Sequence, residues 1–330
     1  MELLAVATNT WSDVAVKLLG IHHITAIASD PQRNLDFYTQ VLGLRFLKRT
    51  VNFDDPASYH FYFGDRTGKP GTIVTFFPWP GARRGTRGTG QVTAISWAVP
   101  AGSIDYWNQR LKSEGLIVEG KTQRFDEQLL RFLDPDGLLI ELNASDSPGD
   151  VDLDFESDVP REFAVRGFHA PTLEVQGMSA TEELLVTFGF YFIGQEGRRR
   201  RFALDKRSTS ARVDLLESPE AQFGNISAGT VHHIAFRCAN EEEQLRWREK
   251  LVDLGLQVTP VIDRQYFHSI YFREPNYILF EIATDGPGFM IDEPVDELGR
   301  GLKLPRQLEP QRKWIEQALP AIELRPPAGL

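Results

Sequence analysis

The chain contains an internal repeat. Residues 20–27 read GIHHITAI and residues 230–237 read TVHHIAFR, and both segments have the apolar composition of a buried strand. A helical pattern follows each segment and stops at a glycine, Gly43 in the first copy and Gly255 in the second. A repeated unit that cannot bury its apolar face alone must pack against its copies. The repeat therefore constrains the fold more tightly than composition does.

Two weaker copies lie between these. A strand-like run at 92–100 precedes a helical pattern at 104–111, and a strand opening at 167–169 precedes a helix around 182–187. The copies recur about every 70 residues, and short β-runs follow the helices. This organisation predicts an α+β fold built from four βαβββ modules.

A further match links the second and fourth copies. Residues 131–141, RFLDPDGLLIE, parallel residues 271–281, YFREPNYILFE, and each segment reads as a hairpin around an acidic-Pro turn that ends on a glutamate. An Asp- and Pro-rich stretch at 145–160 then divides the chain into halves. We therefore expect two domains of two modules each and a C-terminal tail, at 19–146, 164–286 and 287–330.

Composition excludes several function classes. A net charge of -10 argues against nucleic-acid binding, which needs a basic face. Cys238 is the only cysteine, so no intramolecular disulfide can form, as in a reducing compartment. No apolar run approaches the roughly 20 residues of a membrane span. The N-terminus has no basic residue before Lys17, unlike a signal peptide. We expect a cytoplasmic protein.

Histidines are the first candidate ligands. Four of the seven form two pairs at equivalent repeat positions, His22-His23 and His232-His233. A lone histidine in a strand is usually structural, but a pair repeated at matching positions indicates a metal site. Neighbouring strand residues point to opposite faces, so one histidine of each pair should face the interior. The alternation alone does not decide which one.

Glu281 is the candidate third ligand. It lies in an apolar strand, where a carboxylate is costly unless it is paired or bound to a metal. Glu141 occupies the same repeat position but has no histidine in its own unit, so we interpret it as a structural carboxylate rather than a second metal site. Two imidazoles and one carboxylate leave three open positions, which suits Fe(II) that must hold an organic substrate and O2. Redox-inert Zn2+ cannot mediate that electron transfer.

At these residues the sequence resembles the vicinal-oxygen-chelate (VOC, glyoxalase/bleomycin resistance/extradiol dioxygenase) superfamily, and within it the hydroquinone-type ring-cleaving dioxygenases. The segments that carry the resemblance are 19–25 (LGIHHIT), 46–55 (FLKRTVNFDD), 59–65 (YHFYFGD), 264–281 and 298–305 (LGRGLKLP). The resemblance implies two VOC-type domains of cupped mixed β-sheet with flanking helices. It also implies an Fe(II) enzyme that inserts both atoms of O2 into a hydroquinone-type or catecholic aromatic ring.

The resemblance further implies residue roles. It selects the second histidine of each pair, so the metal ligands become His23, His233 and Glu281. Because these ligands come from the first and fourth modules, we expect module one to pair with module four and module two with module three. Around the substrate the resemblance places five further residues, which are His22, Thr25, His232, Arg264 and Tyr271.

Chemistry supports some of these roles. A phenol and a guanidinium can orient substrate and stabilise negative oxygen, and His232 can act as an acid or base. His268 departs from the acidic residue of the resembled family, which leaves substrate preference open. His60 and His169 are interpreted as structural.

Two other functions compete with the dioxygenase. A glyoxalase-like isomerase or lyase usually adds a second carboxylate from the last strand of the partner module, but residues 72–77 contain no Asp or Glu. A non-catalytic small-molecule-binding protein of the same fold needs no metal triad. We therefore favour the dioxygenase, with a small aromatic substrate and O2 as its partners and a homo-oligomer as a possible assembly.

Overall fold

The computed structural model describes residues 17–146, 149, 151–205 and 208–326. It contains four modules of the same order, strand, helix and three strands. The first module comprises β1 (Ile21–Ala28), α1 (Pro31–Asp36) with its π-helical extension η1 (Phe37–Val41), β2 (Arg45–Asn52), β3 (Asp55–Gly64) and β4 (Ile73–Pro78). The second comprises β5 (Gln91–Pro100), α2 (Ile104–Ser113), β6 (Val118–Arg124), β7 (Glu127–Leu133) and β8 (Leu139–Ser145).

The second half of the chain repeats this order. The third module comprises β9 (Thr172–Val175), α3 (Ser179–Thr187), β10 (Tyr191–Glu196), β11 (Arg199–Ala203) and β12 (Arg212–Glu217). The fourth comprises β13 (Val231–Cys238), α4 (Glu241–Asp253), β14 (Ile262–Asp263), β15 (Phe267–Arg273) and β16 (Leu279–Pro287). The tail carries short 3-10 turns and α5 (Arg312–Ala318). The predicted four-module α+β fold is confirmed.

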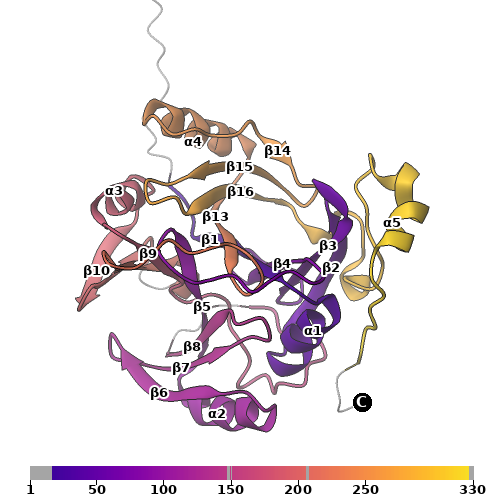
Figure 1. Ribbon diagram of the computed structural model, residues 1–330, viewed down its shortest axis with the longest axis horizontal. Coiled ribbons are helices and arrows are strands. Elements are labelled where there is room, and N and C mark those ends of the chain that lie inside the picture. The colour runs from indigo at the N-terminus through magenta and orange to yellow at the C-terminus, as the bar shows by residue number, and fades with distance from the viewer. Residues whose placement is uncertain (1–16, 147–148, 150, 206–207, 327–330) are drawn as a thin grey trace, which may run out of the picture.

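The modules combine into two mixed eight-stranded sheets. Strand order is β14-β15-β16-β13-β1-β4-β3-β2 in the first and β10-β11-β12-β9-β5-β8-β7-β6 in the second. The first sheet joins modules one and four through antiparallel β1 and β13, and the second joins modules two and three through β5 and β9. The expected pairing of modules is therefore observed (Figure 1). Each half of the chain contributes one module to each sheet, and the domain boundaries at 19–146 and 164–286 stay a prediction.

Local signals define the helices. The Asn240 side chain accepts a hydrogen bond from Glu243 N at 3.0 Å and caps the start of α4, whose first turn is acidic. Gly255 follows the end of this helix with φ of 82°, and Gly43 follows η1 with φ of 69°. A side chain at either position would strain that left-handed backbone, which explains why both helices stop at a glycine.

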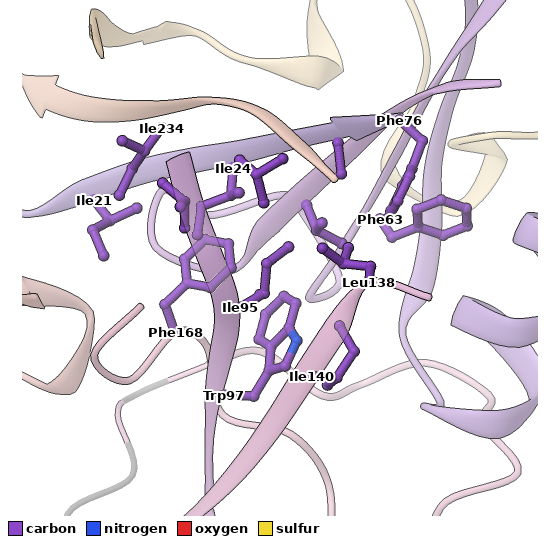
Figure 2. Packing of buried hydrophobic residues seen from close by; sticks show 14 of the residues in the cluster. Ile21, Ile24, Phe63, Phe76, Ile95, Trp97, Leu138, Ile140, Phe168 and Ile234 are labelled. Atoms are coloured by element: carbon purple, nitrogen blue, oxygen red, sulfur yellow. The ribbon is translucent and has the colours of Figure 1, made fainter. Parts of the chain in front are cut away.

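The apolar core lies where the two sheets meet. Figure 2 shows Ile24 and Ile234 of the first sheet close to Ile95, Trp97 and other side chains of the second. Ile24 follows His23 and Ile234 follows His233, the two histidines predicted to be ligands. The alternation of a strand therefore turns them toward the core while the histidines face the opposite side.

The C-terminal tail packs against the β2 side of the first sheet. Lys303 N donates to Arg49 O at 2.9 Å, so the tail covers part of the backbone edge of β2. The fully buried Lys48 ammonium contacts Asp292 Oδ1 at 2.6 Å and also contacts Glu293. Figure 1 shows α5 beside β3.

Within the part of the chain that the structure describes, no helix has the length and apolarity needed to cross a membrane. The expectation that the N-terminus carries no signal peptide concerns residues that lie mostly outside the described ones.

Candidate metal centre and substrate cavity

Three strands of the first sheet bring the predicted ligands together. His23 comes from β1, His233 from β13 and Glu281 from β16, and all three are at least 95 % buried. Glu281 Oε2 lies 3.3 Å from His23 Nε2 and 2.9 Å from His233 Nε2, and the two Nε2 atoms are 3.3 Å apart. Among the described residues, His23, His233 and Glu281 are the three potential ligands whose donor atoms lie close enough together to hold one metal ion.

The three donor atoms fit a single ion. Nitrogen and oxygen ligands bind first-row metals at about 2.0–2.2 Å, which places neighbouring donors on the order of 3.0–3.4 Å apart. The observed separations lie in or just below that range. Glu281 Oε2 is buried and accepts no hydrogen bond of ordinary geometry, although both imidazoles point at it. An orphaned buried carboxylate oxygen is costly unless a cation satisfies it.

Glu281 is held in its charged form. Burial alone would raise the pKa of its carboxyl, but the adjacent His23 and His233 hold that pKa well below its ordinary value. Its other oxygen accepts a hydrogen bond from Ser269 Oγ. The carboxyl group is therefore ionised and oriented, as a metal ligand must be.

The first histidine of each pair supports the second. His22 Nδ1 lies 2.9 Å from His23 Nδ1, and His232 Nδ1 lies 2.8 Å from His233 Nδ1. A ligand that offers the Nε2 lone pair must carry its proton on Nδ1, so as metal ligands His23 and His233 would each donate Nδ1–H to their neighbour. Burial, with the neighbouring imidazole adding to it, lowers the pKa of His22 well below its usual value and that of His232 to about 3. Both supporting rings are therefore neutral acceptors.

A cavity of about 230 Å3 opens beside the metal triad. Most of its lining is aromatic, and Arg264 is the lining cation. The lining residues are His23, Asn52, Phe53, Asp54, His60, Tyr62, Phe77, Trp79, His232, His233, Arg264, Phe267, Tyr271 and Leu279. The cavity is smaller than the roughly 300–1,000 Å3 of pockets for drug-sized ligands, so it suits a molecule with one ring.

Comparison with known proteins decides the family. The profile of the Glyoxalase/Bleomycin resistance protein/Dioxygenase superfamily matches residues 20–142 and 180–282. The chain belongs to this superfamily.

Relatives within the superfamily match almost the whole chain. MhqO of Bacillus subtilis (strain 168), named as a candidate ring-cleaving dioxygenase, is 47 % identical over 315 residues, covering 94 % of this chain and 99 % of its own. The chlorohydroquinone/hydroquinone 1,2-dioxygenase of Sphingobium indicum is 32 % identical over 299 residues, covering 88 % of this chain and 92 % of its own.

Solved structures give the same result. The crystal structure of a candidate dioxygenase from Bacillus subtilis aligns with a TM-score of 0.90 at 46 % identity, over 94 % of this chain and 100 % of that one. Glyoxalase I of Zea mays aligns with a TM-score of 0.58 at 14 % identity, over 81 % of this chain and 92 % of that one, and shares the fold.

Within this superfamily fold, the structure brings Arg264 and Tyr271 to the cavity as a pair. Tyr271 on β15 lies directly opposite Glu281 on β16. Arg264 Nε donates to the Tyr271 hydroxyl at 3.2 Å, and Arg264 Nη1 lies 3.2 Å from Asp54 Oδ2. Burial, reinforced by the Glu281 charge, raises the pKa of Tyr271 above its ordinary value, so its hydroxyl keeps its proton.

Two of the predicted residues do not line the cavity. His22 is buried behind His23, and the Thr25 hydroxyl lies 2.8 Å from that of Thr75 inside the sheet. The placement of His22 and Thr25 around the substrate, behind the residues that line the cavity, stays a prediction. His232, Arg264 and Tyr271 do line it.

The sequence reasoning missed His60, which it interpreted as structural. His60 lines the cavity, with Nε2 at 2.9 Å from Thr75 Oγ1 and Nδ1 at 2.9 Å from the Tyr62 hydroxyl. Burial lowers the pKa of His60 well below its ordinary value, so the ring is neutral. The segment 59–65 carried part of the family resemblance, and that signal pointed to this wall of the cavity.

Thr75 occupies the position in module one that Glu281 occupies in module four. Thr25 pairs with Thr75 in the parallel strands β1 and β4, and Ala235 pairs with Glu281 in the parallel strands β13 and β16. Because Thr25 and Ala235 are equivalent in the repeat, the module-one counterpart of the ligand carboxylate is a neutral hydroxyl. Within the described residues the triad therefore has one carboxylate.

Proposed function

We propose that the protein is an Fe(II)-dependent ring-cleaving dioxygenase of the extradiol type that acts on hydroquinone-type rings. The observation that carries this proposal is the position of the triad, whose two imidazoles line an aromatic cavity of single-ring size while its single carboxylate is buried against them. The name of the Sphingobium relative, a chlorohydroquinone/hydroquinone 1,2-dioxygenase, supports the substrate class.

His23, His233 and Glu281 would hold the iron. Ferrous iron, when bound there, supplies the one-electron chemistry that allows O2 to react with an aromatic ring. The buried Glu281 charge and the pKa of His233, which burial keeps below its ordinary value, match what a divalent cation requires.

Arg264 and Tyr271 would orient the ring. A para-hydroquinone cannot chelate a metal through neighbouring hydroxyls, so the protein must supply the remaining donors. The Tyr271 hydroxyl accepts a hydrogen bond from Arg264 and keeps its own proton, which it can donate to the substrate. His232, neutral because of its burial, lies in the same lining; because its Nδ1 accepts from His233, its Nε2 carries the proton and can donate a hydrogen bond to a substrate oxygen.

The aromatic walls would exclude water. Phe77 and Trp79 are stacked with an interplanar angle of 8°, and Phe267 packs against the His23 ring with centroids 4.9 Å apart. A dry, aromatic site favours a flat apolar ring and strengthens each polar contact made to it.

The product of ring cleavage follows from the two ring carbons that receive the oxygen atoms of O2. Cleavage between a hydroxylated carbon and its hydrogen-bearing neighbour, with both oxygen atoms retained, converts the first carbon to a carboxylic acid and the second to an aldehyde. The neutral Thr75 at the position equivalent to Glu281 favours this chemistry over a glyoxalase-like isomerase, which usually uses a second carboxylate.

Oxygen consumption tests this function. Protein reconstituted anaerobically with Fe(II) should consume one O2 for each hydroquinone, and 18O2 should label both new product oxygens. Turnover of hydroquinone at the same rate without O2 would overturn the proposal. Catechol is the matched comparison, because it chelates a metal without help from Arg264 and Tyr271.

A further inference from the structure

The second sheet contains a cavity at the position equivalent to the metal centre. Glu141 pairs with Ser96 as Glu281 pairs with Ala235, so Glu141 is the counterpart of the ligand carboxylate. Ala94 and Ala170 occupy the repeat positions of His233 and His23. The carboxylate has therefore been kept while both imidazoles have been lost, as expected for Glu141 from the sequence.

A guanidinium neutralises Glu141 in this second cavity. Arg124 Nη1 and Nη2 lie 2.7 and 2.8 Å from the two Glu141 oxygens, and Ser96 Oγ donates to the same carboxylate at 2.6 Å. Together they hold the pKa of Glu141 at about 2, against the effect of its burial. Glu141 is thus satisfied by protein groups and needs no metal.

Arginines also replace the neutral side chains of the catalytic cavity. Arg131 lies opposite Glu141 exactly as Tyr271 lies opposite Glu281. Arg199 pairs with Leu216 of β12, which makes it the counterpart of His60 on β3. The catalytic cavity therefore presents a phenol and a neutral imidazole where the second cavity presents two guanidinium groups, each of which also has a carboxylate partner, Glu119 at 2.9 Å from Arg131 and Asp214 at 3.2 Å from Arg199.

The second cavity has room for a ligand. Its volume is about 360 Å3, within the range of roughly 300–1,000 Å3 seen for small-molecule pockets. Arg87, Arg131 and Arg199 line it together with two carboxylates, Glu141 and Glu174. Arg131 Nε is buried without a hydrogen-bond partner, 3.5 Å from Glu141 Oε1.

Arg87 supplies a cation with no carboxylate partner among the described residues. Its loop is fixed by backbone hydrogen bonds on both sides, from Thr86 N to Asn225 O at 3.1 Å and from Thr89 N to Gln222 O at 3.0 Å. An exposed guanidinium on a fixed loop at the edge of a cavity is suited to pair with an anionic ligand.

We propose that this second cavity binds a small organic carboxylate. Planar guanidinium groups match the geometry of a carboxylate and bind it with two parallel hydrogen bonds. If the proposed function is right, the ligand could be the acid product of ring cleavage. The proposal that the cavity binds a carboxylate does not depend on that function.

Calorimetric titration tests the site. The probe is cis,cis-muconate, a six-carbon dicarboxylate that resembles an opened ring, added to the full-length metal-free protein. We expect saturable binding that Arg87→Gln and Arg131→Gln each weaken about 10-fold or more, the scale of a charge-assisted hydrogen bond. Arg83→Gln is the matched control, because Arg83 lies in the same loop, is exposed and does not line the cavity.

A second kind of variant tests whether binding needs the open volume of the second cavity, without changing its charge. Ala94→Leu fills the cavity beside Glu141 and should also abolish binding without removing a cation. Each variant should leave hydroquinone-dependent O2 consumption unchanged, because none of these residues lines the catalytic cavity.

Several outcomes separate the alternatives. Absence of muconate binding, or sulfate binding of equal affinity, would overturn the carboxylate site. Binding lost in Arg264→Gln but retained in Arg87→Gln would overturn it too, because the probe would then occupy the catalytic cavity. Muconate binding that depends on Arg87 in a protein that consumes no O2 would support the site while contradicting the proposed function.

Discussion

His22 Nδ1 lies 2.9 Å from the ring nitrogen of His23 that does not face Glu281. The same relationship holds between His232 and His233 at 2.8 Å. Each pair therefore combines a predicted ligand with a neighbour that would accept its Nδ1–H and fix its tautomer. These two roles would explain why adjacent histidines recur in the repeat, although only one side chain of each pair can face the proposed metal.

The first prediction separates the two members of each pair. His23→Ala, His233→Ala and Glu281→Ala should each lose bound iron while the protein remains folded. His22→Ala should retain a full equivalent at saturation but bind iron about 10- to 100-fold more weakly, the usual effect of losing an outer-shell partner. Metal analysis measures the bound iron in each variant, and circular dichroism shows whether the variant remains folded. An empty His22→Ala protein beside a loaded His23→Ala protein would reverse our assignment within the pair.

Much of the fold was predictable because its signals are local. A few neighbouring residues determine where a helix ends, as at Gly43 and Gly255, and where an acidic-Pro turn forms. Because the modules repeat, each of these local patterns occurs more than once in the sequence. The pairing of modules one and four was predictable because ligands from both must meet at one ion. The π-helical extension of α1 at Phe37–Val41 was not foreseen, since the apolar pattern does not distinguish it from an α-helix.

The cavity walls were harder to predict than the ligands. Arg264 meets Asp54 across 210 residues of sequence, and Trp79, which follows β4, lines the same cavity as Tyr271 of β15. These residues come together only when modules one and four pack side by side, so no local sequence pattern predicts them. His60 was expected to be structural because a lone histidine in a strand usually is, although the segment 59–65 that contains it carried part of the family resemblance.

The second prediction concerns substrate orientation. Tyr271→Phe deletes the hydroxyl that Arg264 holds but leaves the ring, so iron content should persist. Turnover of hydroquinone should fall by about 10- to 100-fold, the scale of an outer-shell loss. Arg264→Gln should mainly raise KM. Catechol turnover is the control, and it should fall less because catechol can chelate the metal. Iron loss in Tyr271→Phe would instead make the phenol a ligand.

The third prediction distinguishes structural from redox roles of the metal. Removal of the metal by a chelator should lower Tm, because a ligand that binds only the folded state at 100 times its Kd contributes about 2.7 kcal/mol. Fe(II) and Zn2+ should both restore Tm, since His23, His233 and Glu281 can ligate either ion. Fe(II) alone should restore O2 consumption. Equal activity with Zn2+ would contradict a redox role.

The fourth prediction concerns the tail. Lys48 is fully buried and contacts Asp292 and Glu293, of which Glu293 is also buried. Lys48→Met should cost ~3–5 kcal/mol of unfolding free energy, because it removes the buried cation that is in direct contact with the buried Glu293 carboxylate. Lys303→Met is the control, since that partly exposed ammonium lies 3.9 Å from Glu293. Urea denaturation measures both, and equal effects of the two variants would show that burial of the ion pair is irrelevant.

The fifth prediction concerns the Asp134 carboxyl at the turn after β7. Burial raises its pKa to about 7, and the nearby Asp136 charge adds to the effect, although hydrogen bonds from Leu138 N and Tyr38 oppose it. The folded protein then holds this proton more tightly than the unfolded chain, whose carboxyl titrates at about 3.9. The contribution of Asp134 to stability is therefore fully present below about pH 4 and is lost as pH rises to about 7.

Asp134→Asn should remove this pH-dependent contribution to stability. The amide keeps the oxygen that accepts a hydrogen bond from Leu138 N, but it never ionises. The difference in unfolding free energy between variant and wild type should shift in favour of the variant from pH 4 to pH 7 and then remain constant. Asp253→Asn, which changes an exposed carboxyl at the end of α4, is the matched control and should show no such shift. Urea denaturation at a series of pH values measures the difference. A difference that does not change with pH would mean that Asp134 is ionised in the folded protein throughout this range.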